Sequence, residues 1–78
     1  MPNAKEILTA IADYLGLSVE DLDRNASLQD ELGLSPIEIN DLLGHLASKF
    51  DVNFEPEELE NLDKVEDLVS VVEDNLLD

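Results

Sequence analysis

This chain has no cysteine, only four basic residues and no long run of apolar residues among its 78 positions. Without cysteine there is no disulfide framework, no thiolate metal site and no cysteine nucleophile. Four lysines and arginines are too few to hold a phosphate backbone, so a nucleic acid is not an expected partner. No apolar run approaches the roughly 18 residues of a membrane span. No apolar segment follows Met1, so we expect a cytoplasmic protein without a signal peptide.

Acidic residues are abundant: there are twenty, and the formal net charge is −16. This charge argues against anionic membrane surfaces. It favours basic protein partners through a long-range attraction that salt weakens. The alternative, that the acidity mainly confers solubility, stays open. Because 44% of the residues are apolar and recur periodically, we expect a folded domain. With 78 residues, the chain should form a single domain that is too small for a deep active-site cleft. We expect this domain to be a monomer.

The spacing of the apolar residues predicts an all-α domain. In the first predicted helix Ile7, Ile11 and Leu15 share one face, with Asn3 as the N-cap and Gly16 at the C-terminal end. The four predicted helices cover residues 5–16, the segment from Ser35-Pro36 to a turn at 51–54, residues 56–61 and residues 64–76.

A long connection, residues 17–34, separates the first two predicted helices. Near its start we expect a short helical turn capped by Ser18. Connections of this length without regular structure are uncommon in compact domains and are often functional. Four apolar residues should pack the connection across the helices: Leu22, Ala26, Leu28 and Leu32.

The second helix should begin at Ser35 and Pro36, because serine is a favoured N-cap and proline is favoured at the first helical position. Asn40 lies close to the apolar stripe of this helix, and Gly44 interrupts its interior. A buried amide without a partner costs about 1–3 kcal/mol, so we expect long aliphatic groups to be excluded from the domain interior. The alternative is that Asn40 faces solvent.

Several short motifs match one protein family. Asn25-Ala26-Ser27-Leu28, Glu31-Leu32-Gly33 and Phe50-Asp51, together with the helix spacing, resemble the acyl carrier proteins over nearly the whole chain without gaps. The resemblance implies a four-helix bundle of the acyl-carrier type, with three main helices, one short helix and a long first loop. It also implies a non-catalytic carrier of acyl or aminoacyl thioesters on a 4′-phosphopantetheine arm, in fatty-acid, polyketide or nonribosomal-peptide-type biosynthesis.

The attachment motif of that family is altered in this chain. In the family an acidic residue, Leu and Gly lead into Asp-Ser-Leu, and that serine carries the arm. Here Ser35 stands in the aspartate position and Pro36 in the serine position. Attachment requires a hydroxyl at an exposed, rigid point, and a helix N-terminus favours a phosphodiester, so Ser35 is the candidate attachment residue. The alternatives are that Ser35 is only an N-cap, worth about 1 kcal/mol, and that the chain is an unmodified interaction module without the arm.

The resemblance implies a phosphopantetheinyl transferase and acyl-transfer or synthase enzymes as partners, whose basic patches would meet an acidic surface. The candidate partner-binding residues are Glu38, Asp41, Glu57 and Glu58, with solvation as the alternative role of the last two. The second helix is less acidic than in fatty-acid carriers because it ends in Ala47-Ser48-Lys49, whereas residues 51–78 hold 11 acidic residues against Lys64 alone. We therefore expect a specialised polyketide or peptide pathway.

Neither a catalytic set nor a metal-binding set is expected. Residues 21–32 begin like a calcium loop, but Ala26 occupies the glycine position and Leu32 the glutamate position, so an EF-hand is rejected. His45 is the single histidine, and in a chain without cysteine it is interpreted as an ordinary surface residue.

Overall fold

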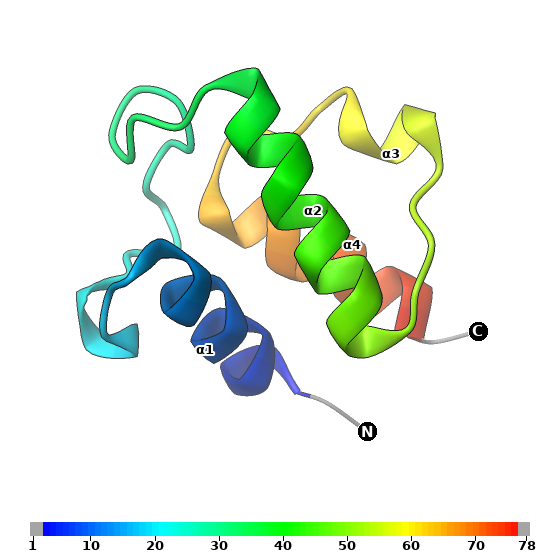
Figure 1. The fold of residues 1–78 in the computed structure, drawn as a ribbon, viewed down its shortest axis with the longest axis horizontal. Helices are drawn as coiled ribbons and strands as arrows, with labels where there is room; N and C mark the ends of the chain where they lie inside the picture. The colour runs from blue at the N-terminus through cyan, green and yellow to red at the C-terminus, as the bar shows by residue number, and fades with distance from the viewer. Residues whose placement is uncertain (1–2, 77–78) are drawn as a thin grey trace.

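The computed structural model describes residues 3–76. Positions 1–2 and 77–78 of the predicted domain lie outside the described residues. The elements are α1 (Ala4–Leu15), the 3-10 turn η1 (Val19–Asp21), α2 (Pro36–Phe50), α3 (Pro56–Leu59) and α4 (Val65–Leu76), arranged as in Figure 1. The prediction of an all-α domain is confirmed, since the only β-type pairing within residues 3–76 is an isolated bridge between Ser27 and Lys64.

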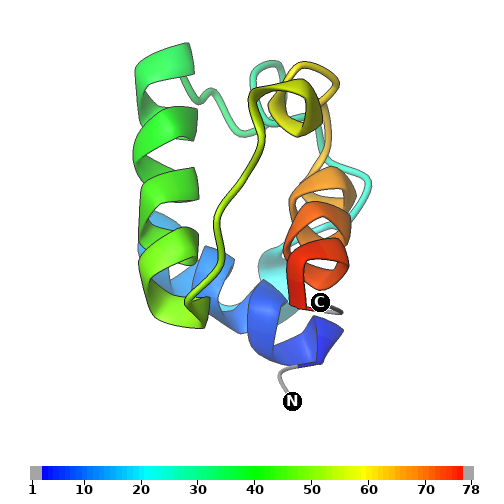
Figure 2. The ribbon, with the colours of Figure 1, turned by 90° about the vertical axis from the view of Figure 1, so that its right-hand side faces the viewer.

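The three long helices pack against one another around a single apolar core. Figure 2 shows α2 and α4 on opposite sides of the domain, with α1 crossing below them. Each helix buries the face that its apolar spacing predicts, because residues three and four apart lie on the same side of a helix. The fully buried large side chains are Ile7, Ile11, Leu28, Leu42, Leu46, Val65, Leu68, Val69 and Val72.

The helix predicted over residues 5–16 runs from Ala4 to Leu15, and both of its predicted caps are confirmed. The side-chain oxygen of Asn3 accepts the backbone N–H of Glu6 at 2.9 Å and so satisfies one of the free donors of the first turn. Gly16 ends the helix in the left-handed region, with φ of 75°, and its N–H bonds back to the carbonyl groups of Ala12 and Asp13.

Two other helix boundaries differ from the prediction. The helix predicted over residues 56–61 ends at Leu59, and the helix predicted over residues 64–76 begins at Val65. The second difference has a local cause. The carboxylate of Asp67 accepts the backbone N–H groups of Asp63 and Lys64, both at 2.9 Å, so these two residues form the cap that precedes α4.

Two glycines provide a matched test of this helical backbone. A Cβ added at either Gly16 or Gly44 meets no atom within 4 Å, so the backbone alone decides the effect of alanine. Gly16→Ala places a side chain at positive φ and should lower the free energy of unfolding by about 1 kcal/mol. Gly44→Ala removes a flexible residue from a helix interior and should raise it by about 1 kcal/mol. Urea unfolding followed by circular dichroism measures both changes, and effects of the same sign would contradict the assigned backbone.

The long connection is held against the start of α4. Leu22, Ala26 and Leu28 are buried as predicted, and Leu32 is half-buried. Backbone bonds tie the two segments together: the N–H of Leu28 donates to Asp63 at 2.8 Å, that of Val65 to Ala26 at 3.1 Å, and that of Glu66 to Arg24 at 2.8 Å. The connection is therefore an ordered part of the domain that is bonded to the start of α4.

The capping role predicted for Ser18 was wrong, and of the two alternatives for Asn40 the structure shows the one in which it faces solvent. Ser18 precedes the predicted turn, but its hydroxyl donates to the carboxylate of Asp21 at 2.7 Å and does not cap the backbone. Asn40 and Gly44 are both exposed on α2. Because Asn40 faces solvent, its amide has no burial cost. This residue therefore gives no ground for excluding aliphatic groups from the interior.

Candidate functional site

The predicted start of α2 is confirmed. Ser35 is the N-cap and Pro36 occupies the first turn, where its missing N–H leaves no unpaired donor. The Oγ of Ser35 accepts the N–H of Glu38 at 3.2 Å, and the N–H of Ser35 donates to the Oε1 of Glu38 at 3.0 Å. These two bonds form a reciprocal capping box, which fixes the direction of the Ser35 side chain.

The hydroxyl of Ser35 remains suited to reaction in this geometry. The residue is exposed, and the capping bond uses only one of the two lone pairs of Oγ. The N–H groups and the dipole of the first turn favour an anion at this point. The negative charge of the Glu38 carboxylate opposes that preference. Hydrogen bonds from Ser35, first from its N–H and then from its hydroxyl, hold the pKa of Glu38 below its usual value and so favour the charged form.

The segment before Ser35 is also fixed by backbone bonds. Gly33 adopts φ of 69°, a left-handed conformation that glycine takes without strain. The N–H of Leu32 donates to Ser27 at 3.0 Å and that of Leu34 to Leu28 at 2.9 Å. The candidate attachment point therefore lies at the end of an ordered loop, and the sequence Leu32-Gly33-Leu34 has a structural role in orienting it.

The four candidate partner-binding residues fall on two separate helices. Glu38 and Asp41 are exposed on α2, and Glu57 is exposed on α3. Glu58 is half-buried: its Oε2 accepts the side-chain N–H of Asn75 at 2.8 Å, which joins α3 to α4. The Oε1 of Glu58 accepts the N–H of Glu55 at 3.3 Å, so both oxygens of this carboxylate already accept structural bonds. Partner binding by all four residues stays a prediction.

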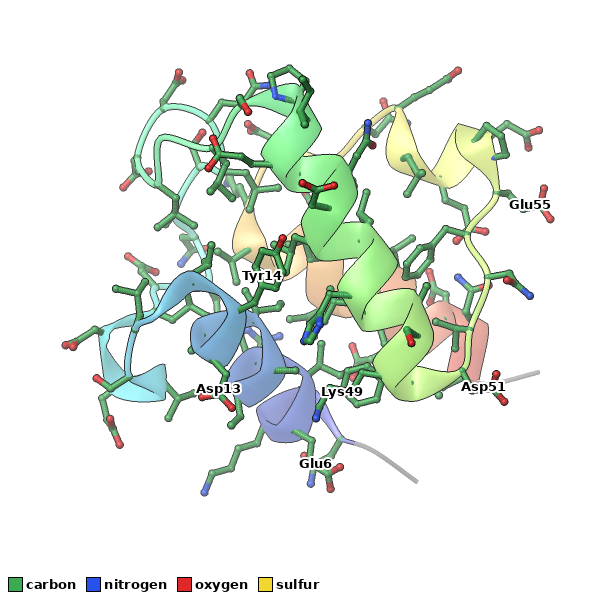
Figure 3. All side chains as sticks on the ribbon, viewed as in Figure 1. Glu6, Asp13, Tyr14, Lys49, Asp51 and Glu55 are labelled. Carbon is green, nitrogen blue, oxygen red and sulfur yellow. The ribbon has the colours of Figure 1, made fainter. Side chains whose placement is uncertain are left out.

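A groove beside the candidate site was not predicted from the sequence. Its volume is about 400 Å³, and it is lined by Tyr14, Leu15, Leu17, Glu31, Leu32, Leu34 and Glu38. Figure 3 shows Tyr14 between the end of α1 and α2, where its ring lies 5.1 Å from the ring of His45. His45 is exposed, as expected of a surface residue. Tyr14 follows Ile7 by seven residues and so shares its helix face, which is the signal that the sequence offered.

Residues 3–76 contain neither a cluster of metal-binding side chains nor a membrane-spanning helix. No three or more His, Asp or Glu side chains there are grouped so that they could hold a metal ion. No helix in the same range is long and apolar enough to cross a membrane.

Known proteins that are similar to this chain show which family it belongs to. A family described as the phosphopantetheine attachment site matches residues 5–72. The chain belongs to this family. It is 32% identical over 71 residues to an acyl carrier protein of Exiguobacterium sp., covering 91% of this chain and 90% of the relative. It is 34% identical over 68 residues to an acyl carrier protein of Exiguobacterium sibiricum, covering 87% and 86%. An acyl carrier protein of Solidesulfovibrio magneticus is 26% identical over 73 residues, covering 94% of each chain.

Membership of the acyl carrier family agrees with the fold described above and confirms the resemblance seen in the sequence. Acyl carrier proteins serve biosynthetic enzymes as carriers. The structure places Pro36 at the start of α2 and the exposed hydroxyl of Ser35 at the preceding N-cap position.

Proposed function

We propose that residues 1–78 act as a single carrier domain that holds 4′-phosphopantetheine on Ser35 and carries acyl or aminoacyl thioesters. The proposal rests on one observation: an exposed hydroxyl at the N-terminus of α2, in a chain that belongs to the acyl carrier family. We place it in a fatty-acid, polyketide or nonribosomal-peptide-type pathway, with the low charge of α2 favouring the latter two.

In the attachment step the Oγ of Ser35 attacks the pyrophosphate of coenzyme A. A bond forms between Oγ and the phosphorus that bears the pantetheine, the pyrophosphate P–O bond breaks, and adenosine 3′,5′-diphosphate leaves. The hydroxyl proton passes to a base of the transferase. When bound, the arm supplies a thiol that holds the cargo as a thioester. Ser35 would hold the arm, and Pro36, which has no N–H, stiffens the first turn, where the N–H of Glu38 already donates to the Oγ of Ser35.

Incubation with coenzyme A and a promiscuous phosphopantetheinyl transferase, followed by intact-mass measurement, tests the attachment. We expect a gain of one phosphopantetheine on the natural chain and no gain on Ser35→Ala. Loss of the N-cap costs only about 1 kcal/mol, so the alanine variant should remain folded. Ser35→Asn keeps the cap without the hydroxyl and is the matched control. A mass gain that persists in either variant would contradict attachment at Ser35.

A second candidate function is a carrier-like interaction module without the arm. The capping box favours it, because the Ser35 oxygen already has a structural partner and Pro36 has no hydroxyl. Such a module would bind a basic partner protein through the acidic surface. A salt-sensitive complex that Ser35→Ala forms as well as the natural chain would support this candidate. A complex that forms only with the arm attached would contradict it.

For either function we propose a cytoplasmic monomer whose acidic surface meets basic patches of its partners. The transferase and the acyl-transfer or synthase enzymes are the partners of the first candidate. Asp41 and Glu57 are exposed, and one oxygen of Glu38 is bonded to the N–H of Ser35, so these three contribute more readily than Glu58, both of whose carboxylate oxygens accept bonds within the domain. The net charge of −16 supplies the long-range attraction.

A further inference from the structure

Part of the apolar surface that the domain leaves exposed lies in the groove beside Ser35. Within residues 3–76 the exposed large hydrophobic side chains are Tyr14, at 41%, Leu17, at 38%, and Ile37, at 72%. Two of these three line the groove, and Ile37 lies outside it. Exposed apolar surface with a polar rim marks interaction sites on soluble proteins.

The polar rim of the groove consists of two carboxylates that the backbone holds in place. The Oε1 of Glu31 accepts the N–H of Ser27 at 3.1 Å, and the Oε1 of Glu38 accepts the N–H of Ser35 at 3.0 Å. Each carboxylate keeps its second oxygen for a further donor. Because the two side chains are already fixed, a cationic ligand would meet them with little loss of side-chain freedom.

We propose that this groove docks a segment of a partner protein in which an apolar side chain lies next to an arginine or lysine. The apolar side chain would pack between Tyr14 and Leu17, and the cationic group would reach the free oxygens of Glu31 and Glu38. A long basic side chain suits such a place because its methylene groups cover apolar surface while its charge stays at the rim. The proposal does not depend on whether Ser35 carries the arm.

Charge complementarity selects this occupant over the others. In a symmetric dimer a second copy would bring the same acidic rim against this one, since none of its four basic residues lines the groove. Anionic lipid would be repelled for the same reason. The phosphodiester of an arm on Ser35 would be repelled by Glu38, which shares the capping box with that residue.

The groove lies next to the candidate attachment residue, so a partner docked in the groove is also close to Ser35. Leu34 lines the groove and directly precedes Ser35, and Glu38 belongs to both the rim and the capping box. A partner held there approaches Ser35 from the side of α1, and not over the exposed face of α2 that carries Ile37.

Two synthetic helical peptides provide the probe. The first carries leucine and arginine on one face, and the second replaces each leucine with serine at the same charge. Titration of the unmodified, ¹⁵N-labelled chain should shift amide signals of Leu15, Leu17, Leu32 and Leu34 with the first peptide only. Glu31→Gln with Glu38→Gln should weaken binding about tenfold, because glutamine keeps each backbone bond and removes the charge. Leu17→Ala should weaken it about fivefold.

Two control variants remove the same groups elsewhere. Ile37→Ala deletes the most exposed apolar side chain, and Glu60→Gln with Glu66→Gln removes two exposed charges that do not line the groove. Both should leave binding unchanged within about twofold. The proposal is overturned if neither peptide binds, if both bind equally, if the shifts centre on Ile37 or on α3 and α4, or if the controls weaken binding as much as the groove variants.

Discussion

Leu28→Ala is expected to lower the free energy of unfolding by about 2–5 kcal/mol, as large-to-small changes in a packed core do. Leu28 lies in the long connection, yet its side chain is fully buried, and its N–H donates to the carbonyl of Asp63 at 2.8 Å. Native domains are stable by only about 5–15 kcal/mol, so the expected loss is a large fraction of the total stability.

Urea unfolding of Leu28→Ala beside Gln29→Ala measures this effect. Gln29 is the exposed neighbour in the same connection, and its replacement should change stability by less than about 0.5 kcal/mol. Equal, small effects for the two variants would show that the connection is not part of the core, and the orientation of Ser35 would then lose its support.

Restoring the family's attachment order should accelerate modification. The double variant Ser35→Asp with Pro36→Ser keeps a favoured N-cap and moves the hydroxyl into the first turn. A misplacement of about 1 Å can cost about 10²-fold in rate, so the transferase should modify the double variant about 10²-fold faster than the natural chain. Time-resolved intact mass with one transferase measures both rates.

The single variants are the controls for that rate. Ser35→Asp alone leaves no hydroxyl at either position and should not be modified, and Pro36→Ser alone offers both positions. Equal rates for the natural chain and the double variant would contradict the account of the displaced hydroxyl. Modification of the double variant alone, with none of the natural chain, would support the module without an arm.

The features that the sequence predicted well depend on neighbouring residues. Asn3, Ser35 and Pro36 act within one turn of their own positions, and Gly16 ends a helix because of its own backbone freedom. Apolar spacing likewise fixes which face of a helix is buried. The error at Ser18 is local too, since a hydroxyl can donate to a nearby carboxylate as readily as it accepts a backbone N–H.

The features that the sequence did not predict depend on contacts between distant segments. The groove requires the end of α1, the loop at Glu31 and the start of α2 to meet, and no motif encodes that meeting. Asn40 lies between the buried and exposed faces of α2, so the packing angle of the helix decides its exposure. The start of α2 at Ser35 and Pro36, by contrast, was predicted from the sequence.

Peptide mapping by mass spectrometry, on the protein purified from cells that naturally make it, tests the central claim most directly. The account predicts that the peptide containing Ser35 carries one phosphopantetheine and that fragment ions place it on the Ser35 oxygen. An unmodified Ser35 peptide in protein from cells with an active transferase would contradict it, as would an arm found on another hydroxyl.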